Sequence, residues 1–205
     1  MSGDLPIVYI VDDDVSVREA LEALIQASGW QPFVFASARE FLAHPRALSA
    51  SCLILDISMP DLNGLELQRR VAADRPDMPI IFITGYGDIP TSVKAMKAGA
   101  VEFLTKPFAD DELLNAISGA LERSAAALHA VVEKEALRER YARLSNRERE
   151  VMRMVASGLM NKQVAGELGI SEITVKAHRG RVMRKMQADT FADLVNIATK
   201  LEKQN

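Results

Sequence analysis

Side chains suited to phosphoryl chemistry follow four separate apolar runs in the first half of the chain. They are Asp12 and Asp13, Asp56, Thr84, and Lys106. Carboxylates that converge without partners repel one another, and a hard divalent cation such as Mg²⁺ removes that cost. A carboxylate next to such an ion, with an ammonium and a hydroxyl opposite, is arranged to attack a phosphorus atom and to stabilise its oxygens. The pattern therefore predicts that Asp56 is a nucleophile.

Each of these residues, taken alone, also has a purely structural explanation. Asp14 and Asp56 are suited to capping a helix or closing a turn, Lys106 to a solvated surface, and Thr84 to a strand end. The hypothesis of a shared site therefore depends on their common position after different apolar runs.

The elements that would position these side chains alternate between short apolar runs and helical patterns. The runs read as strands covered on both faces: Ile7–Val11, Gln31–Phe35, Cys52–Leu55, Pro79–Thr84 and Val101–Thr105. Apolar residues recur at helical spacing in Val15–Ala27, near Ala38–Leu42, in Leu65–Asp74 and in Pro90–Lys97. Five strands that alternate with helices predict an α/β fold with a doubly wound, five-stranded parallel sheet. Such sheets bind ligands at the carboxyl ends of their strands.

A long helical pattern without a breaker starts near Asp110 and continues through residue 141. We interpret it as one helix that leaves the first domain and serves as a linker. A shorter helix followed by a flexible tether is the alternative, and the imperfect apolar stripe leaves a coiled coil open. The predicted domains are residues 1–122 and 142–205, with a helical linker over residues 123–141.

Four motifs in the first domain, VDDD, DISMPDLNG, FITGYGD and KAGAVEFLTKPF, occur in an order that resembles the receiver domain of two-component response regulators. The resemblance runs from residue 5 to about residue 122 and implies a flavodoxin-like fold. It implies that Asp56 accepts a phosphoryl group from a sensor histidine kinase. It further implies that Asp13, Asp56 and the main-chain carbonyl of Ser58 bind Mg²⁺, with Asp12 holding the ion through water.

The same resemblance implies that three residues respond to phosphorylation. Thr84 would move to the phosphoryl oxygens, Lys106 would pair with them, and Phe103 would turn inward, although Phe103 also fits a plain core aromatic. The Lys106-Pro107 peptide is usually cis in such domains. Ser58 and Tyr86 stand at two positions that influence how water reaches the acyl phosphate.

The second part of the chain differs from the first in charge. Residues 1–141 carry 13 basic and 21 acidic side chains, a net charge of −8, whereas residues 142–205 carry 12 and 7, a net charge of +5. A basic domain beside an acidic one predicts a polyanionic partner. Ser145 and Glu148 match a capping box, and Asn161 and Ser171 are candidate caps of two further helices. A fourth helix after Thr190 should turn its apolar side chains toward a core: Phe191, Leu194, Val195 and Ile197. Together these signals predict a small all-α bundle.

The third of these helices, EITVKAHRGRVMRKM, is suited to a DNA groove. At 100° per residue, Val175, Val182 and Met186 share one face, which predicts a core face. The opposite face contains Ile173, Ala177, Gly180 and Arg184, flanked by Lys176 and Arg181. Small residues edged by cations would allow close approach in the major groove and neutralise phosphates. A solvated surface helix is the alternative.

The stretch from Ser145 to Met186 resembles the helix-turn-helix of LuxR/NarL-type output domains, and with the receiver it points to the FixJ branch of response regulators. The resemblance implies base-edge contacts by Lys176, Ala177 and Gly180. It implies phosphate contacts by Lys162, Thr174, Arg179, Arg181 and Lys185.

Together these observations predict a transcription regulator controlled by phosphorylation rather than an enzyme. Phosphorylation of Asp56 would favour a homodimer through the fourth helix and fifth strand, and the dimer would bind double-stranded promoter DNA. The single cysteine, Cys52, and the lack of a secretion signal predict a cytoplasmic protein. The alternatives are a phosphatase of the haloacid-dehalogenase type, which would need a second Asp where Ser58 stands, and a receiver whose basic bundle binds only protein.

Overall fold

Five short strands form a parallel sheet in the computed structural model of this chain, which describes residues 5–60, 62–85 and 89–202. The strands are β1 (Ile7–Val11), β2 (Gln31–Phe35), β3 (Ser51–Asp56), β4 (Ile80–Thr84) and β5 (Glu102–Thr105). Their order across the sheet is β2-β1-β3-β4-β5, with every neighbouring pair parallel. The predicted doubly wound sheet is therefore confirmed.

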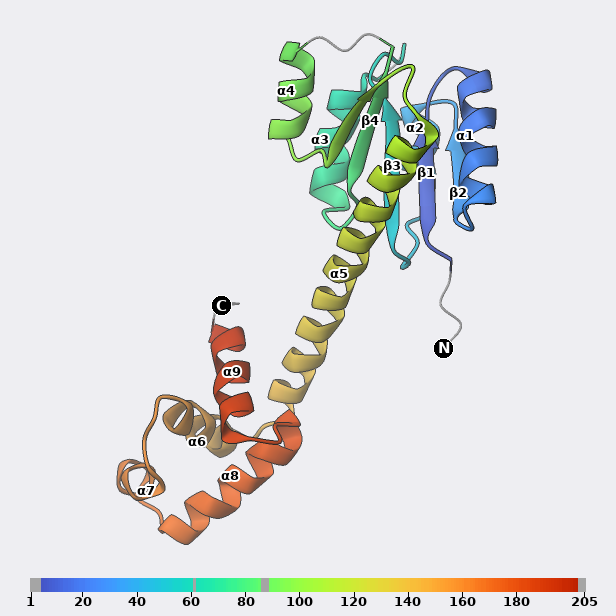
Figure 1. Ribbon diagram of the computed structural model, residues 1–205. Helices are drawn as coiled ribbons and strands as arrows, with labels where there is room; N and C mark the ends of the chain where they lie inside the picture. Colours follow the sequence, from blue (N-terminus) through green and yellow to red (C-terminus); the bar gives the residue numbers. More distant parts are fainter. Residues whose placement is uncertain (1–4, 61, 86–88, 203–205) are drawn as a thin grey trace. The chain divides into compact units, whose positions relative to one another are not determined.

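Helices cover both faces of this sheet (Figure 1). They are α1 (Val15–Ala27), α2 (Ala38–Ala43), α3 (Gly64–Asp74), α4 (Ile89–Lys97) and α5 (Asp110–Ala142). The helices α1 and α5 pack on one face, whereas α2, α3 and α4 pack on the other. The helices of both layers follow strands of one parallel sheet, so the loops after the strands all lie at its carboxyl edge. These loops bring together residues that are distant in the sequence.

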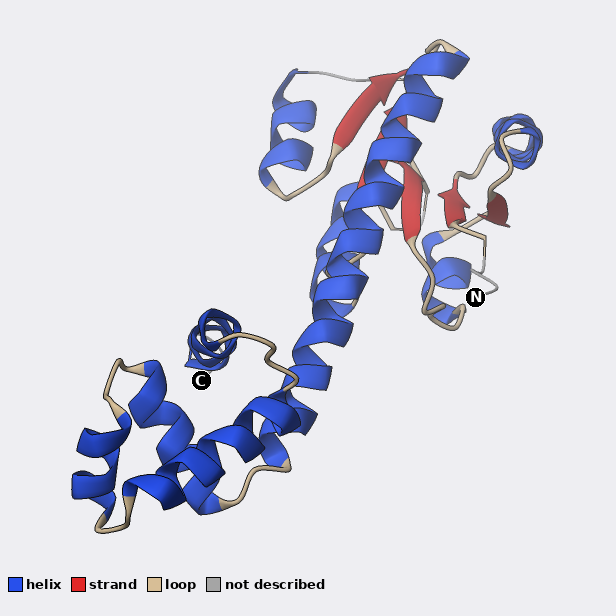
Figure 2. Ribbon diagram, turned by 60° about the horizontal axis from the view of Figure 1, so that its bottom comes forward, coloured by secondary structure: helices blue, strands red, loops and turns tan. Residues whose placement is uncertain are grey.

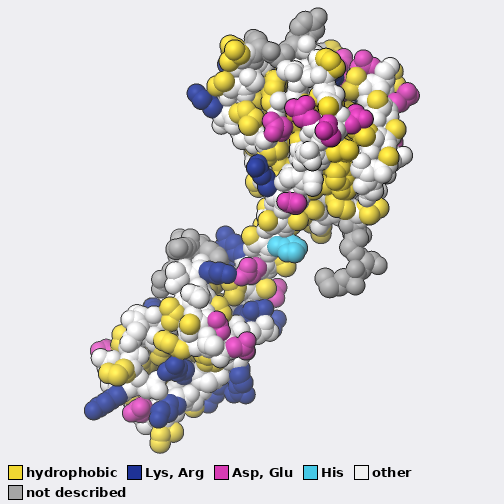
Figure 3. Space-filling model, viewed as in Figure 1, with side chains coloured by type: hydrophobic (Ala, Val, Ile, Leu, Met, Phe, Trp, Pro, Cys, Tyr) yellow, Lys and Arg dark blue, Asp and Glu magenta, His cyan; other side chains and the backbone are white. Residues whose placement is uncertain are grey.

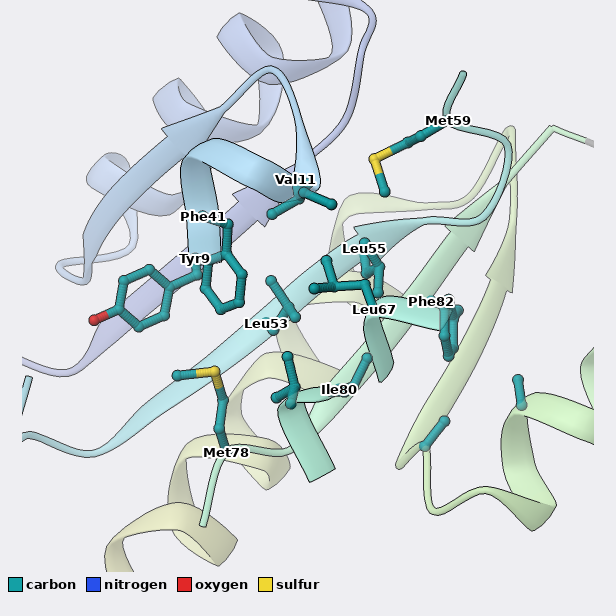
Figure 4. Close-up of a cluster of buried hydrophobic side chains, with 14 of the residues drawn as sticks. Tyr9, Val11, Phe41, Leu53, Leu55, Met59, Leu67, Met78, Ile80 and Phe82 are labelled. Atoms are coloured by element: carbon teal, nitrogen blue, oxygen red, sulfur yellow. The ribbon is translucent and has the colours of Figure 1, made fainter. Parts of the chain in front are cut away.

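Alternating side chains along the strands supply the two cores. Tyr9, Leu53 and Phe82 point to the face covered by α2, α3 and α4, where Figure 4 shows them packed with neighbouring apolar side chains. Their strand neighbours Ile10 and Ile54 point to the face covered by α1 and α5. This two-residue period divides the side chains of each inner strand between the two cores.

The two outer strands are less buried than the three inner ones. All residues of β1, β3 and β4 are buried, whereas β2 and β5 are mostly half-buried or exposed. Helices nevertheless cover both faces of these strands, as predicted: Phe33 and Val34 of β2, and Phe103 and Leu104 of β5, pack into the cores on opposite faces. The two strands form the edges of the sheet, where one side of each strand has no neighbouring strand.

Local sequence signals set the helix ends next to the sheet. The side chain of Asp14 accepts a hydrogen bond from the backbone N–H of Ser16 at 2.8 Å, and so caps α1. After α1 and α4 the chain turns at Gly29 and Gly99, with φ angles of +82° and +95°. Because an L side chain rarely adopts such angles, glycine ends these helices at low cost.

The chain divides into two compact units, Met1–His129 and Ala130–Asn205. The boundary lies inside α5, a continuous helix of 33 residues, as the predicted linker helix required. Residues 129–135 are all exposed, although Glu133 forms a 2.7 Å ion pair with Lys200 in the second unit. The second unit therefore contains the end of α5, and the predicted start of the second domain at residue 142 stays a prediction. None of the helices in the described ranges is long and apolar enough to cross a membrane.

The second unit is built from helices only, over the residues that the structure describes (Figure 2). After α5 these are α6 (Asn146–Ala156), α7 (Asn161–Leu168), α8 (Glu172–Met186) and α9 (Phe191–Glu202). The predicted capping box is present: Ser145 and Glu148 each accept the other's backbone N–H. Gly169, with a φ of +62°, ends α7 and leads into α8, whose cap is Ser171.

Two local predictions for this unit are wrong. Asn161 does not cap α7; it is the first helical residue, and the cap position is Met160, whose N–H donates to the side chain of Gln163. Phe191 does not enter the core, since it is 39% exposed and lies under the guanidinium of Arg179. In both cases a contact with Arg179, from a different helix, decides where the side chain lies.

Candidate functional site

Two carboxylates and one ammonium meet at the carboxyl edge of the sheet. Pairing of Val11 with Leu55 in β1 and β3 brings Asp12 and Asp56, one residue further along, side by side. The Nζ of Lys106, which follows β5, lies 2.7 Å from Asp12 Oδ2 and 3.6 Å from Asp56 Oδ1. Three of the predicted site residues, from three different strand ends, are thus in contact.

Asp56 is nearly buried, with 5% of its surface exposed. Its Oδ2 accepts the backbone N–H of Ser58 at 2.9 Å, so Oδ1 is the oxygen on the side of Lys106. Burial raises the pKa of this carboxyl group, and the neighbouring Asp12 raises it further, whereas Lys106 and the Ser58 N–H lower it. The carboxylate is therefore oriented by its backbone and incompletely compensated in charge.

Asp12 is held more firmly than Asp56. Its Oδ1 accepts the N–H of Asp14 at 2.9 Å, its Oδ2 accepts from Lys106, and its main-chain carbonyl accepts from Arg18 at 2.7 Å. Asp13, in contrast, is exposed beside it. The acidic edge thus combines two fixed, buried carboxylates with a third that faces solvent.

Thr84 and Phe103 lie close to this edge. Thr84 is buried at the end of β4, and its main-chain carbonyl accepts the backbone N–H of Lys106 at 2.8 Å. Phe103 is half-buried, with its ring centroid 6.3 Å from that of Phe82. The Lys106-Pro107 peptide is cis, as predicted. Tyr86 lies outside the described residues.

The side chains predicted to bind Mg²⁺ fit such an ion in kind but do not form a closed cluster. Within residues 5–60, 62–85 and 89–202, no three His, Cys, Asp or Glu side chains converge closely enough to hold a metal ion. The ammonium of Lys106 instead contacts both buried carboxylates. All available donors are oxygens, and one ammonium leaves two carboxylates with a net negative charge, which suits a hard divalent cation.

Gly64 allows the loop after β3 to close against the site. A Cβ at this position would lie 2.5 Å from the main-chain oxygen of Asp56 and 3.0 Å from the Cα of Ile57. Both are backbone atoms, so no side chain could move aside. The first turn of α3 therefore packs directly on the end of the strand that carries Asp56.

We expect Gly64→Ala to destabilise the first unit by about 1–3 kcal/mol, because the overpacking must displace backbone. Acetyl phosphate should also label the variant more slowly than the wild type, since the end of β3 moves. Urea denaturation and labelling kinetics measure the two effects. Gly119→Ala is the matched control: a Cβ there meets nothing within 4 Å, so a gain of up to about 1 kcal/mol is expected. Equal behaviour of the two variants would contradict the close approach at Gly64.

The helix α8 presents the predicted basic face to solvent. Val175, Val182 and Met186 are fully buried, as predicted. The residues of the opposite face and its flanks are all exposed: Ile173, Lys176, Ala177, Gly180, Arg181 and Arg184. Lys162 and Thr174, at the starts of α7 and α8, are exposed as well. In Figure 3, Lys and Arg side chains are spread over the second unit, whereas Asp and Glu gather on the visible face of the first.

Two predicted DNA contacts are instead engaged within the unit. Lys185 donates to Glu148 Oε2 at 2.6 Å and to the main-chain oxygen of Arg143 at 3.1 Å. Arg179 donates to Asn161 at 3.3 Å, and its guanidinium carbon lies 4.7 Å from the centroid of the Phe191 ring. The capping box pointed to Glu148, but nothing in the local sequence indicated its contact with Lys185, 37 residues away.

Comparison with known proteins assigns both units to described families. Residues 8–118 match the response regulator receiver domain, and residues 142–198 match the bacterial regulatory proteins of the luxR family. Nodulation protein W of Bradyrhizobium diazoefficiens is 49% identical over 195 residues, which cover 95% of this chain and 86% of that protein. The transcriptional regulatory protein FixJ of the same organism is 40% identical over 193 residues, 94% of each chain.

Solved structures show the same similarity. The response regulator StyR aligns with a TM-score of 0.87 at 45% identity, covering 96% of this chain and 100% of that chain. Full-length FixJ from B. japonicum aligns with a TM-score of 0.58 at 39% identity over both complete chains.

Proposed function

Because the chain belongs to the response regulators that join a receiver domain to a LuxR-type DNA-binding domain, we propose that phosphorylation of Asp56 controls its binding to promoter DNA. The family consists of transcriptional regulators of two-component systems rather than enzymes of the ordinary kind, and a receiver domain implies a histidine kinase as partner. The convergence of Asp12, Asp56 and Lys106 carries the proposal. Since promoter DNA is the target, we place the protein in the cytoplasm.

In the proposed transfer, Asp56 Oδ1 attacks the phosphorus of a phosphohistidine. An oxygen–phosphorus bond forms, the phosphorus–nitrogen bond breaks, and the imidazole of the kinase leaves. The N–H of Ser58 holds Oδ2 and so directs the other oxygen to the incoming group. The ammonium of Lys106, 3.6 Å from Oδ1, can form an ion pair with the phosphoryl oxygens as the negative charge develops on them. The hydroxyl of Thr84 would bind the same oxygens.

Receiver domains generally use Mg²⁺ for phosphorylation. Here Asp13, Asp56 and the main-chain carbonyl of Ser58 would hold the ion, with Asp12 bound through water. The ion would supply the positive charge that Lys106 alone does not, and so bring two anionic groups together. The haloacid-dehalogenase alternative is set aside, because the first unit matches the receiver family and Ser58 replaces the required acid.

A dimer interface on α4 and β5 would pass the signal on. Phosphorylation would move Thr84 and Phe103 toward the site and shift the α4 and β5 surface from one of its two conformations to the other. A charge added at the site would thus change a surface that lies away from it. Large apolar side chains on α4 are exposed and available for such a contact: Ile89, Val93 and Met96. Two output units could then occupy two half-sites of DNA.

The exposed face of α8 would enter the major groove. Lys176, Ala177 and Gly180 would lie at the base edges. The small Ala177 and Gly180 allow the helix backbone to approach the bases, and the long side chain of Lys176 can reach their acceptor atoms. Phosphate contacts would come from Lys162, Thr174, Arg181 and Arg184. Arg179 is a further phosphate contact in this proposal, whereas the contacts of Lys185 with Glu148 and Arg143 indicate a different role for Lys185.

Labelling and DNA binding of the full-length chain test the proposal together. After incubation with acetyl phosphate and Mg²⁺, we expect one phosphoryl adduct, mapped to Asp56 by peptide mass spectrometry and lost when Mg²⁺ is removed. The labelled protein should retain a subset of genomic promoter fragments more tightly than the unlabelled protein, and more weakly at higher salt. An adduct on another residue, or equal retention by both forms, would refute the proposal.

A further inference from the structure

A buried acid connects three helices in the otherwise basic second unit. Glu148 is 3% exposed, and its Oε2 accepts the backbone N–H of Ser145 at 2.9 Å and the ammonium of Lys185 at 2.6 Å. The same ammonium donates to the main-chain oxygen of Arg143 at 3.1 Å. One ion pair therefore joins the start of α6, the last turn of α8 and the chain just after α5.

The negative charge of Glu148 is not needed for the helix cap. A glutamine at the same position of a capping box accepts the N–H of the cap residue equally well. A buried charge is costly unless it is paired and hydrogen-bonded. Lys185 supplies that pairing and is the main reason why the pKa of Glu148 lies below its ordinary value. The charge is therefore explained by its partner on α8.

Because Lys185 lies on α8, its ion pair with Glu148 influences the orientation of the helix that carries the proposed DNA-facing surface. Lys185 lies one turn after Arg181 and next to Arg184, and the helix is continuous from Glu172 to Met186. The far end of α8 is fixed by the Ser171 cap and by the buried Val175. The near end is held by the buried Val182 and Met186 and, through Lys185, by Glu148. Contacts with base edges are sensitive to the rotation and depth of the helix that these contacts set.

We infer that Glu148 and Lys185 are positioning residues for DNA recognition: they hold α8 in the orientation that reads base edges, and Lys185 acts through Glu148 rather than on a DNA phosphate. This inference rests on the proposed DNA-binding face of α8. It assigns a recognition role to an acid that would otherwise repel DNA.

Glu148→Gln in the full-length phosphorylated protein separates a pure effect of charge from positioning of α8, because the two predict opposite changes in affinity for the promoter site. Removing an acid strengthens DNA binding if only charge matters. If Glu148 positions α8, binding to a retained promoter site should weaken roughly tenfold, about the effect of one mismatched base pair, while binding to unrelated DNA stays the same or tightens. Unchanged or tighter binding to the promoter site would overturn the inference.

Lys185→Met, compared with Arg181→Met, separates positioning from phosphate contact. Affinity for DNA falls as salt rises, and each lost phosphate contact makes the slope of log affinity against log salt less steep by about 0.9. We expect this change for Arg181→Met. Lys185→Met should leave this salt slope unchanged and reduce only the affinity for the promoter site relative to unrelated DNA. A slope that becomes less steep by as much as in Arg181→Met would make Lys185 a phosphate contact and overturn the inference.

The double variant Glu148→Gln/Lys185→Gln keeps the test valid if a single variant folds poorly. Two glutamines can hydrogen-bond without leaving a buried charge, so the double variant should fold and lose less promoter affinity than the two single losses combined. Independent, additive losses would show no coupling and overturn the inference. If the wild type shows no preference for any promoter fragment, the proposed function fails instead.

Discussion

Replacing Asp56 with Asn is expected to reduce labelling by acetyl phosphate to background and to remove the effect of phosphorylation on promoter binding. An amide oxygen is a far weaker nucleophile than a carboxylate oxygen, and the substitution also removes one charge from the site that would hold Mg²⁺. The fold should persist, because Asn keeps an oxygen that accepts the N–H of Ser58. Phosphoryl incorporation and gel shifts with and without acetyl phosphate measure the result.

Asp74→Asn is the matched control for this experiment. Asp74 is exposed at the end of α3, so it changes the net charge of the first unit by the same amount without touching the acidic edge. It should label at the wild-type rate. Wild-type labelling of Asp56→Asn would show that the phosphoryl group is accepted elsewhere.

Neutralising three exposed cations on the proposed DNA-facing side of α8 is expected to have the largest effect on DNA binding. Changing Lys176, Arg181 and Arg184 to Gln removes up to three phosphate or base contacts. In the proposed arrangement Arg181 and Arg184 contact phosphates and Lys176 contacts a base edge. The slope of log affinity against log salt should therefore become less steep by about 1.8, or about 0.9 for each phosphate contact. Affinity for the promoter site should fall by roughly two orders of magnitude or more, since each lost contact of this kind costs about 1–3 kcal/mol. Titrations at several salt concentrations give both values.

A second triple variant distinguishes contact from general charge. Lys134, Arg138 and Arg153 are also exposed in the second unit but lie on α5 and α6. Their change to Gln alters the net charge equally and should shift the salt slope only slightly. Similar losses in the two triple variants would contradict a DNA-binding face on α8.

The features that could be predicted from the sequence are those carried by short-range patterns. Short apolar runs located the five strands of the sheet, and helical periods and cap signals located the helices of the described ranges. The acids after β1 and β3 indicated the edge at which they meet. The cap by Asp14 and the capping box at Ser145 were also legible, because both partners lie within three residues of each other.

The features that could not be predicted depend on partners distant in the sequence. The lower burial of β2 and β5 follows from strand order, which strand composition does not reveal. The burial of Glu148 and the positions of Asn161 and Phe191 depend on cations of α8 that reach other helices. For Arg179 and Lys185 the resemblance implied phosphate contacts, and their partners on other helices could not be read from the sequence of α8.

The exposed turns of α5 have a consequence for how such chains can be reassembled. Over residues 129–135 no side chain is buried, so neither unit's core depends on them. A recombination junction placed there could exchange one half for that of another protein without repacking either interior. The same seven residues are suited to inserted or deleted turns, because a change in length there disturbs the helix itself and one exposed ion pair, Glu133 with Lys200.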